Sequence, residues 1–177
     1  PYTDSPLDGE PVGEAVYLNL ISKARDYVYI TTPYLVVSDS VNTALCNAAK
    51  SGVDVRLMTP HIPDKRVIFE VTRAHYEPLL EAGVKVYEYT PGFVHGKNFA
   101  VDDCYGCVGS INLDYRSLFL HFEDSVWLCG GPTVLDIKRD FLDTQELCEE
   151  ITLARCREHS VFRRLLRAVL RVFAPLM

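Results

Sequence analysis

The chain has 177 residues, of which 48% are hydrophobic and 24% charged, a balance typical of one globular domain rather than of a disordered or fibrous chain. No run of 18 apolar residues occurs, which excludes a membrane-spanning helix within this sequence. A formal net charge of −6 argues against a chain whose main task is to grip duplex nucleic acid, because phosphate contacts need clustered cations. The chain begins at Pro1 without a signal segment, so we expect a piece of a longer protein.

Helical and strand patterns alternate along the chain. The expected helices cover residues 15–26, a segment from a cap at Ser38–Ser40 to a stop at Gly52, residues 65–82 with a break at Pro78, residues 133–147, and a segment from Ser160 onward. The expected strands are Tyr27–Thr32, Val53–Met58, Val84–Tyr89, one strand on each side of a turn at Asp102–Asp103, and Phe122–Leu128.

Repeated strand–helix–strand units indicate parallel strands with right-handed crossovers and helices on both faces of the sheet. The strands between residues 84 and 128 follow one another too closely for intervening helices, so they should pair antiparallel. We therefore predict a single domain over residues 1–177. Its fold is an α/β class, three-layer α/β/α sandwich with a mixed, largely parallel central sheet.

The C-terminal segment 155–177 carries six arginines and one acid, and it is predicted to be a basic amphipathic helix. One helical sector holds Arg163, Arg164, Arg167 and Arg171, and apolar residues occupy the opposite side. Two interpretations stay open. The helix docks on the domain with its arginines in water, or it lies at a membrane surface with its arginines on anionic headgroups.

The densest chemical signal lies between Phe93 and Glu123. His95 and Lys97 are two residues apart on an extended segment, so both point to one side of the sheet. Ser110 and Asn112 repeat this spacing and add a hydroxyl and an amide that can donate to a phosphate oxygen. A turn after Asp102 can fold the second pair beside the first, which predicts a phosphate site that needs no metal. Glu123 is the candidate carboxylate that orients the His95 ring.

His-x-Lys-x4-Asp-x6-Gly-Ser-x-Asn is the signature of the phospholipase D superfamily, and the match here is complete at His95, Lys97, Asp102, Gly109–Ser110 and Asn112. The chain also resembles the C-terminal catalytic half of bacterial cardiolipin synthases. The segments that carry this wider resemblance are Thr32–Leu35, Gly52–Arg56, Gly83–Lys97, Asn112–Leu118 and the arginine-rich C-terminus.

The resemblance implies transfer of a phosphatidyl group from one phosphatidylglycerol to another through a phosphohistidine, with no cofactor and no metal. It implies that His95 is the acid and base, and that Lys97, Ser110 and Asn112 stabilise the charge on phosphate. Glu123 would orient His95. Asp102 belongs to the catalytic motif, but we expect it to pair with the surrounding structure rather than touch substrate.

This superfamily uses two such motifs, and the chain contains one. We therefore expect the partner to be the N-terminal half of the same chain or a second copy of this one. The resemblance also implies anionic phospholipid as substrate, no nucleic acid, and a soluble piece that works at the cytoplasmic face of the bacterial membrane. Two alternatives remain: a phosphodiesterase or nuclease with the same motif, and a catalytically inert half that binds lipid or serves assembly.

Other residues have weaker signals. Tyr34, His61 and Arg116 are possible pocket residues, since the first two follow strands and Arg116 can pair with Asp114 or with a lipid phosphate. An exposed tyrosine and an ordinary capped loop around His61 and Asp64 are the alternatives. We expect His75 to be a partly buried core histidine and His121 to have a structural role beside the site. Of the six cysteines, only Cys104 and Cys107 have a suggestive spacing, and reduced, buried cysteines are the simpler interpretation.

Overall fold

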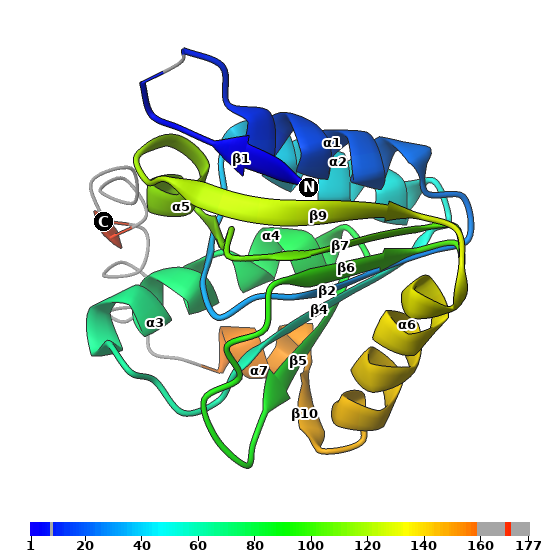
Figure 1. Cartoon of the computed structure of the whole chain (residues 1–177). Coiled ribbons are helices and arrows are strands. Elements are labelled where there is room, and N and C mark those ends of the chain that lie inside the picture. The colour runs from blue at the N-terminus through cyan, green and yellow to red at the C-terminus, as the bar shows by residue number, and fades with distance from the viewer. Residues whose placement is uncertain (8, 159–168, 171–177) are drawn as a thin grey trace.

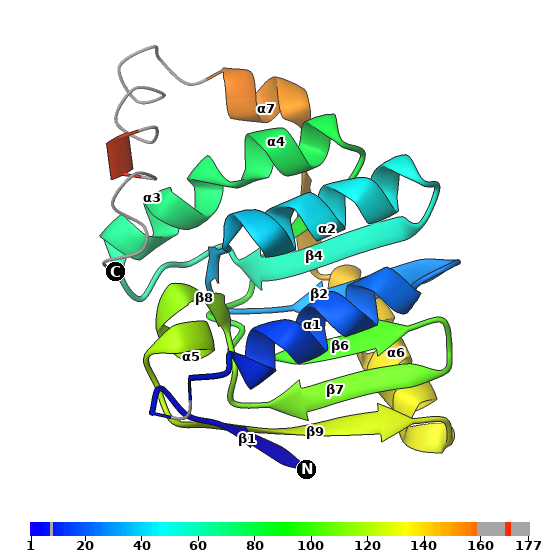
Figure 2. The same ribbon diagram turned by 90° about the horizontal axis from the view of Figure 1, so that it is seen from above.

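The computed structural model describes residues 1–7, 9–158 and 169–170. Its strands are β1 (Tyr2–Asp4), β2 (Tyr27–Thr31), β3 (Leu35–Val36), β4 (Asp54–Pro60), β5 (Lys85–Tyr89), β6 (Asn98–Val101), β7 (Tyr105–Gly109), β8 (Leu113–Asp114), β9 (Glu123–Cys129) and β10 (Cys148–Ile151). Its helices are α1 (Val12–Lys23), α2 (Asp39–Lys50), α3 (Arg66–Ala74), α4 (Tyr76–Glu81), α5 (Tyr115–Phe119), α6 (Pro132–Gln145) and α7 (Leu153–Arg157). The predicted three layers are confirmed, with α1 to α4 on one face of the main sheet and α6 on the other (Figure 1 and Figure 2).

The main sheet has eight strands in the order β1-β9-β7-β6-β2-β4-β5-β10. β2, β4 and β5 are parallel neighbours, and β6 runs antiparallel to β2 with Thr31 opposite Asn98. The start of β6 therefore lies at the edge where the three parallel strands end. This edge, which we call the carboxyl edge, is where open α/β sheets bind ligands.

The sheet is mixed, as predicted, but the expectation that it is largely parallel is wrong. Among the described strands of this sheet, only the pairs β2–β4 and β4–β5 are parallel, and the other five pairs are antiparallel. A short connection joins β6 to β7, so these two strands return antiparallel. β9 pairs antiparallel with β7, and β10 pairs antiparallel with β5, although longer segments precede them.

Two predicted helix boundaries show how local chemistry decides an element. Ser38 caps α2 as expected, because its hydroxyl accepts a hydrogen bond from the Val41 N–H at 3.3 Å. The predicted break at Pro78 lies three residues too late, since α3 ends at Ala74 and Pro78 sits inside α4. A proline ring clashes with the carbonyl four residues earlier, which here belongs to Ala74, so the helix ends there.

The core lies between the sheet and the layer of α1, α2 and α4. Its largest fully buried side chains include Tyr17, Tyr76 and Phe99, and the Tyr17 and Phe99 rings stack with centroids 4.3 Å apart. A smaller cluster joins α6 to the opposite face of the sheet through Tyr29 and Phe141, whose centroids are 5.0 Å apart. The buried strand Tyr27–Thr31 contributes side chains to both clusters, as its continuous apolar sequence predicted.

Several short elements were not predicted, namely β1, β3, β8, β10, α5 and α7. Each has five residues or fewer and lacks enough sequence to show a periodicity. The predicted amphipathic helix falls mostly on residues 159–168 and 171–177, so Arg163, Arg164, Arg167 and Arg171 lie outside the described residues. Within the described part of the chain, no helix is long and apolar enough to cross a membrane.

Candidate active site at the carboxyl edge of the sheet

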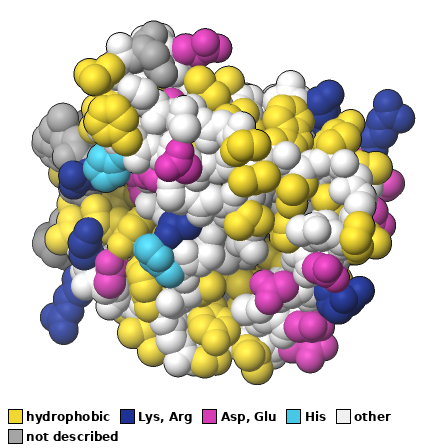
Figure 3. All heavy atoms as spheres, in the orientation of Figure 1, with side chains coloured by type: hydrophobic (Ala, Val, Ile, Leu, Met, Phe, Trp, Pro, Cys, Tyr) yellow, Lys and Arg dark blue, Asp and Glu magenta, His cyan; other side chains and the backbone are white. Residues whose placement is uncertain are grey.

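His95 and Lys97 meet directly just before β6. The Lys97 ammonium lies 2.9 Å from Nδ1 and 3.1 Å from Nε2 of the His95 ring, and it donates to the His95 carbonyl oxygen at 2.9 Å. Both side chains therefore occupy one side of the segment, as the two-residue spacing predicted. On the face shown in Figure 3, the histidine side chains lie in the left half with basic side chains near them, on the side on which β6 begins in Figure 1, and further basic side chains lie at the right.

The electrostatics of this pair favour a neutral imidazole. Partial burial lowers the pKa of His95, the Lys97 charge lowers it further, and the Asp64 carboxylate opposes the shift. Burial also lowers the pKa of Lys97, against the opposing charges of Glu123 and Asp114. Since an unperturbed imidazole titrates near ~6.5, the His95 ring is neutral at pH 7 and can accept a proton.

Ser110 and Glu123 form a second pair beside Lys97. The Ser110 hydroxyl donates to a Glu123 carboxylate oxygen and also accepts from the Asp124 N–H at 2.9 Å. The His121 ring nitrogen lies 3.7 Å from the same carboxylate, so His121 stands beside the site as expected. Among the described residues, the hydrogen bonds of the His95 ring come from Lys97, and Glu123 instead holds Ser110. The predicted Glu123–His95 contact is therefore absent from this arrangement.

Asn112 presents an unpartnered polar group near the same edge. Its side-chain carbonyl oxygen is buried, and no described residue gives it a hydrogen bond. The next residue, Leu113, donates its N–H to the Thr32 hydroxyl at 3.1 Å, which ties this segment to the end of β2. A buried amide without a partner is costly in a folded protein, so Asn112 is suited to a ligand.

Asp102 does not share this site, which removes it from the catalytic residues, and it pairs with the surrounding structure as expected. It follows β6 at the end remote from His95, and its carboxylate accepts hydrogen bonds from the N–H groups of Arg25, Asp26 and Tyr27 at 2.7, 3.0 and 2.8 Å. The residue has a φ of 50°, so the predicted turn after β6 is present. Its role is to hold the connection between α1 and β2, as a structural aspartate would.

Aromatic side chains extend the site toward the loop after β4. The Phe93 ring centroid lies 5.6 Å from that of His95 and 6.1 Å from that of Tyr34. The Tyr34 hydroxyl donates to the Asp64 carboxylate at 2.5 Å, and burial together with this bond raises the pKa of Tyr34. Tyr34 thus lines the surroundings of His95, whereas Phe93 was not singled out from the sequence because no pattern marks it.

The remaining candidate residues from the sequence differ in the contacts they make. His61 lies at the end of β4 and contacts Glu88, while His75 is 2% exposed and is a core residue, as expected. Arg116 is exposed on α5, and the carboxylate of Asp114 caps this helix by accepting from the Ser117 N–H at 2.8 Å rather than pairing with Arg116.

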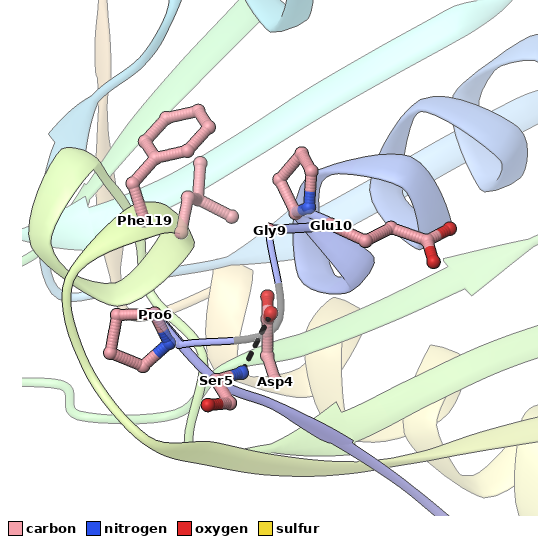
Figure 4. A pocket seen from close by; sticks show the side chains of 8 residues that line it. Asp4, Ser5, Pro6, Gly9, Glu10 and Phe119 are labelled. Carbon is pink, nitrogen blue, oxygen red and sulfur yellow. Dashed lines mark hydrogen bonds between the residues drawn. The ribbon is translucent and has the colours of Figure 1, made fainter.

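A separate hollow of about 200 Å³ lies between the loop after β1, the start of α1 and the end of α5. Figure 4 shows Asp4, Ser5 and Phe119 around it. The Asp4 carboxylate accepts from the N–H groups of Ser5 and Gly13 at 3.0 and 2.6 Å, so it is used in holding the start of α1. This hollow contains none of the motif residues. Within the described ranges, no group of three or more histidine, cysteine, aspartate or glutamate side chains is arranged to hold a metal ion.

Comparison with known proteins agrees with this geometry. Residues 17–144 match the family described as cardiolipin synthase, PLD-like domain, where PLD stands for phospholipase D. The chain belongs to this family. A protein of Streptococcus mutans described as uncharacterized is 46% identical over the whole chain, which covers 38% of that protein. The cardiolipin synthase of Halalkalibacterium halodurans is 36% identical over 94% of the chain and 33% of its own length, and cardiolipin synthase 2 of Bacillus anthracis is 38% identical over 92% and 32%.

Solved structures show the same fold at low sequence identity. Nuc, a phospholipase D family member from Salmonella typhimurium, superposes with a TM-score of 0.69 at 18% identity, covering 78% of this chain and 90% of Nuc. Phosphatidylserine synthase of Haemophilus influenzae gives a TM-score of 0.73 at 14% identity, covering 98% of this chain and 44% of the synthase. The chain therefore has the phospholipase D fold, and it spans about a third of the length of the curated relatives named above.

Proposed function

We propose that this chain supplies one of the two catalytic histidines of a cardiolipin synthase-like phosphatidyltransferase that acts on phosphatidylglycerol. The observation that carries the proposal is the contact between the neutral ring of His95 and the Lys97 ammonium at the carboxyl edge. One group can transfer a proton there and the other can hold a phosphate oxygen. The buried, unpartnered side-chain oxygen of Asn112 is an acceptor, so it fits a hydroxyl of the reacting alcohol rather than a phosphate oxygen.

The reaction needs a second histidine as nucleophile. In the first step a nitrogen–phosphorus bond forms to that histidine, and the bond from phosphorus to the oxygen of the headgroup glycerol breaks. Protonated His95 gives this leaving oxygen its proton. In the second step the hydroxyl of another phosphatidylglycerol loses its proton to neutral His95 and attacks phosphorus, and the nitrogen–phosphorus bond breaks, which releases the nucleophilic second histidine. The lowered pKa of His95 favours this second step, because its neutral ring is the base.

The second histidine comes from outside these 177 residues, since the chain has a single motif. The relatives are about three times as long as the matched region, so the partner in our proposal is the N-terminal half of the same protein, and a second copy is the alternative. The proposed place of action is the cytoplasmic face of the membrane, where the anionic substrate lies. The six arginines from Arg155 onward supply positive charge for that surface.

The test uses the full-length protein with vesicles that contain phosphatidylglycerol, and it measures cardiolipin and free glycerol. His95→Gln should lower the rate at least a hundredfold, because a positioned acid and base contributes about 10²–10⁴-fold. Lys97→Met should also abolish most activity, whereas Lys23→Met is its matched control, because Lys23 is exposed in the last turn of α1.

Three outcomes would contradict the proposal. Normal cardiolipin formation by His95→Gln would refute the role of the histidine. Hydrolysis of DNA without cardiolipin formation would favour the nuclease alternative. Salt-sensitive binding to anionic vesicles without any turnover or phosphohistidine would favour an inert lipid-binding half.

A further inference from the structure

A fully buried carboxylate lies close to the carboxyl edge but outside the motif. Glu88 in β5 is 0% exposed, and Arg73 donates to it twice, from Nε to Oε1 at 2.8 Å and from Nη2 to Oε2 at 2.6 Å. The Tyr76 hydroxyl donates to Oε1 at 3.2 Å. A buried carboxylate is costly unless it is paired and hydrogen bonded, and here Arg73 and Tyr76 give both oxygens of Glu88 a donor.

Glu88 also holds the ring of His61. Nδ1 of His61 lies 2.9 Å from Oε2 of Glu88. Because a carboxylate accepts hydrogen bonds, Nδ1 of His61 is the donor of this pair, and in the imidazole form of the ring Nε2 is then the acceptor. The His61 side chain is 35% exposed, and among the described residues none hydrogen bonds to Nε2. The buried network therefore fixes one tautomer and presents an acceptor at the surface.

His61 and His95 lie at the same edge of the sheet. Thr31 of β2 is opposite Met58 of β4 and opposite Asn98 of β6, and both histidines lie three residues beyond this level in the same direction. The backbone N–H of His61 continues the ladder by donating to Tyr89 O at 3.0 Å. One strand separates β4 from β6, so two strand spacings place the end of β4 and the start of β6 roughly 10 Å apart along the edge.

The groups around His61 select the chemistry of a ligand. Oε2 of Glu149 lies 4.0 Å from Nδ1 of His61, and the other oxygen of Glu149 is engaged by Arg155. Nε2 of His61 and this Glu149 oxygen are both acceptors, and two carboxylates beside the ring disfavour an anion. A ligand here should be uncharged and donate hydrogen bonds, as the hydroxyls of a polyol do.

We propose that His61 and Glu149 form a subsite for the hydroxyl groups of a glycerol headgroup, with Glu88 and Arg73 as positioning residues. The inference rests on the proposed function, because it assigns the acceptor preference of the same site. A phosphoryl group held at His95 places its attached or incoming headgroup along this edge toward β4. The subsite then distinguishes an alcohol that carries several hydroxyls from an alcohol of equal length that carries one.

The experiment uses the full-length protein and a phosphatidyl p-nitrophenyl ester as donor, whose leaving group has no glycerol. Glycerol and 1-propanol compete as acceptors at equal concentration, and the ratio of phosphatidylglycerol to phosphatidylpropanol is measured by mass spectrometry. Both products come from the same molecules, so the ratio does not depend on the amount of folded protein. Wild type should prefer glycerol, and His61→Leu should lower the ratio about tenfold, the effect of one lost hydrogen bond.

Controls separate the subsite from a general defect. His61→Gln retains a carbonyl acceptor and should keep part of the preference, while Lys65→Leu, an exposed position in the same loop, should leave the ratio unchanged. A wild-type ratio near one, or equal ratios in wild type and His61→Leu, would overturn the subsite. His95-dependent formation of the two phosphatidyl alcohols in that same experiment would leave the proposed function standing, because the acceptor alcohol must lose its proton to His95. Transfer to the alcohols that does not need His95 would overturn the proposed function instead.

Discussion

Gly109, the glycine of the motif, offers a sharp test of how the site is built. It ends β7 and lies opposite Ser125 of β9. A Cβ atom at position 109 would meet Ser125 Oγ and the Asp124 carbonyl oxygen well inside contact distance, and it would lie 2.5 Å from Ser125 Cβ. The Asp124 carbonyl cannot move away freely, because it accepts from the Ser110 N–H at 2.8 Å. The substitution Gly109→Ala therefore forces the two strands apart.

The expected cost is about 3 kcal/mol of the free energy of unfolding. Overpacking by one methyl group in a tight region costs roughly 1–3 kcal/mol, and here the obstacle is backbone and a buried Ser125 side chain rather than the end of a flexible one. Displacement of β9 also moves Glu123 away from Ser110, so activity should fall more than the loss of folded protein explains. Urea unfolding monitored by Trp127 fluorescence, with linear extrapolation, measures the first effect.

Gly92→Ala is the matched control. No atom lies within 4 Å of a Cβ at position 92, and the residue does not have a positive φ. The alanine variant should unfold within about 0.5 kcal/mol of wild type, as surface substitutions usually do. A Gly109→Ala protein as stable as Gly92→Ala would refute the argument that close approach of β7 and β9 requires glycine.

Two further predictions concern residues of the same motif. Asp102→Asn should lower the free energy of unfolding by about 1–2 kcal/mol, because an NH2 group replaces an oxygen that accepts from backbone N–H groups. Turnover per folded molecule should be unchanged. A loss of turnover at unchanged stability would show that Asp102 takes part in the reaction. Lys97→Met should raise the pKa of His95, because a nearby positive charge is removed, so the falling limb of kcat/KM, which reports loss of the proton that His95 donates in the first step, moves to higher pH. NMR titration of the His95 ring checks this shift, with Lys23→Met as the control, and an unmoved pKa would contradict it.

The sequence predicted the His95–Lys97 contact and the hairpin that follows because both are local. Lys97 and Gly109 belong to the two arms of one hairpin, and the Gly109 N–H donates to the Lys97 carbonyl at 3.3 Å. The alternation of a strand places His95 and Lys97 on one side without any information about the rest of the fold. The same reasoning found the turn at Asp102–Asp103, where both residues have positive φ values.

The contacts that the sequence did not predict join distant segments. Whether Glu123 contacts His95 or Ser110 depends on the position of the first residue of β9. Pairing of β9 with β7 fixes that position. The Glu88 network is a stronger case, because it combines β4, α3, α4 and β5. From the sequence alone, a glutamate in a strand is expected to face solvent. Only the fold shows that helices cover this face of β5 and bury Glu88.

The architecture explains why these two kinds of contact meet at one edge. The loops that follow β2, β4 and β5 lie at one edge of the sheet. Because β6 runs in the opposite direction, the motif residues just before it lie at the same edge. In the proposed function, the motif residues react with and hold the phosphoryl group. The loop after β4 lies two strands away and contributes His61, so it can change without disturbing the hairpin. Together, our two proposals assign the reaction to the hairpin and the choice of alcohol to the neighbouring loop.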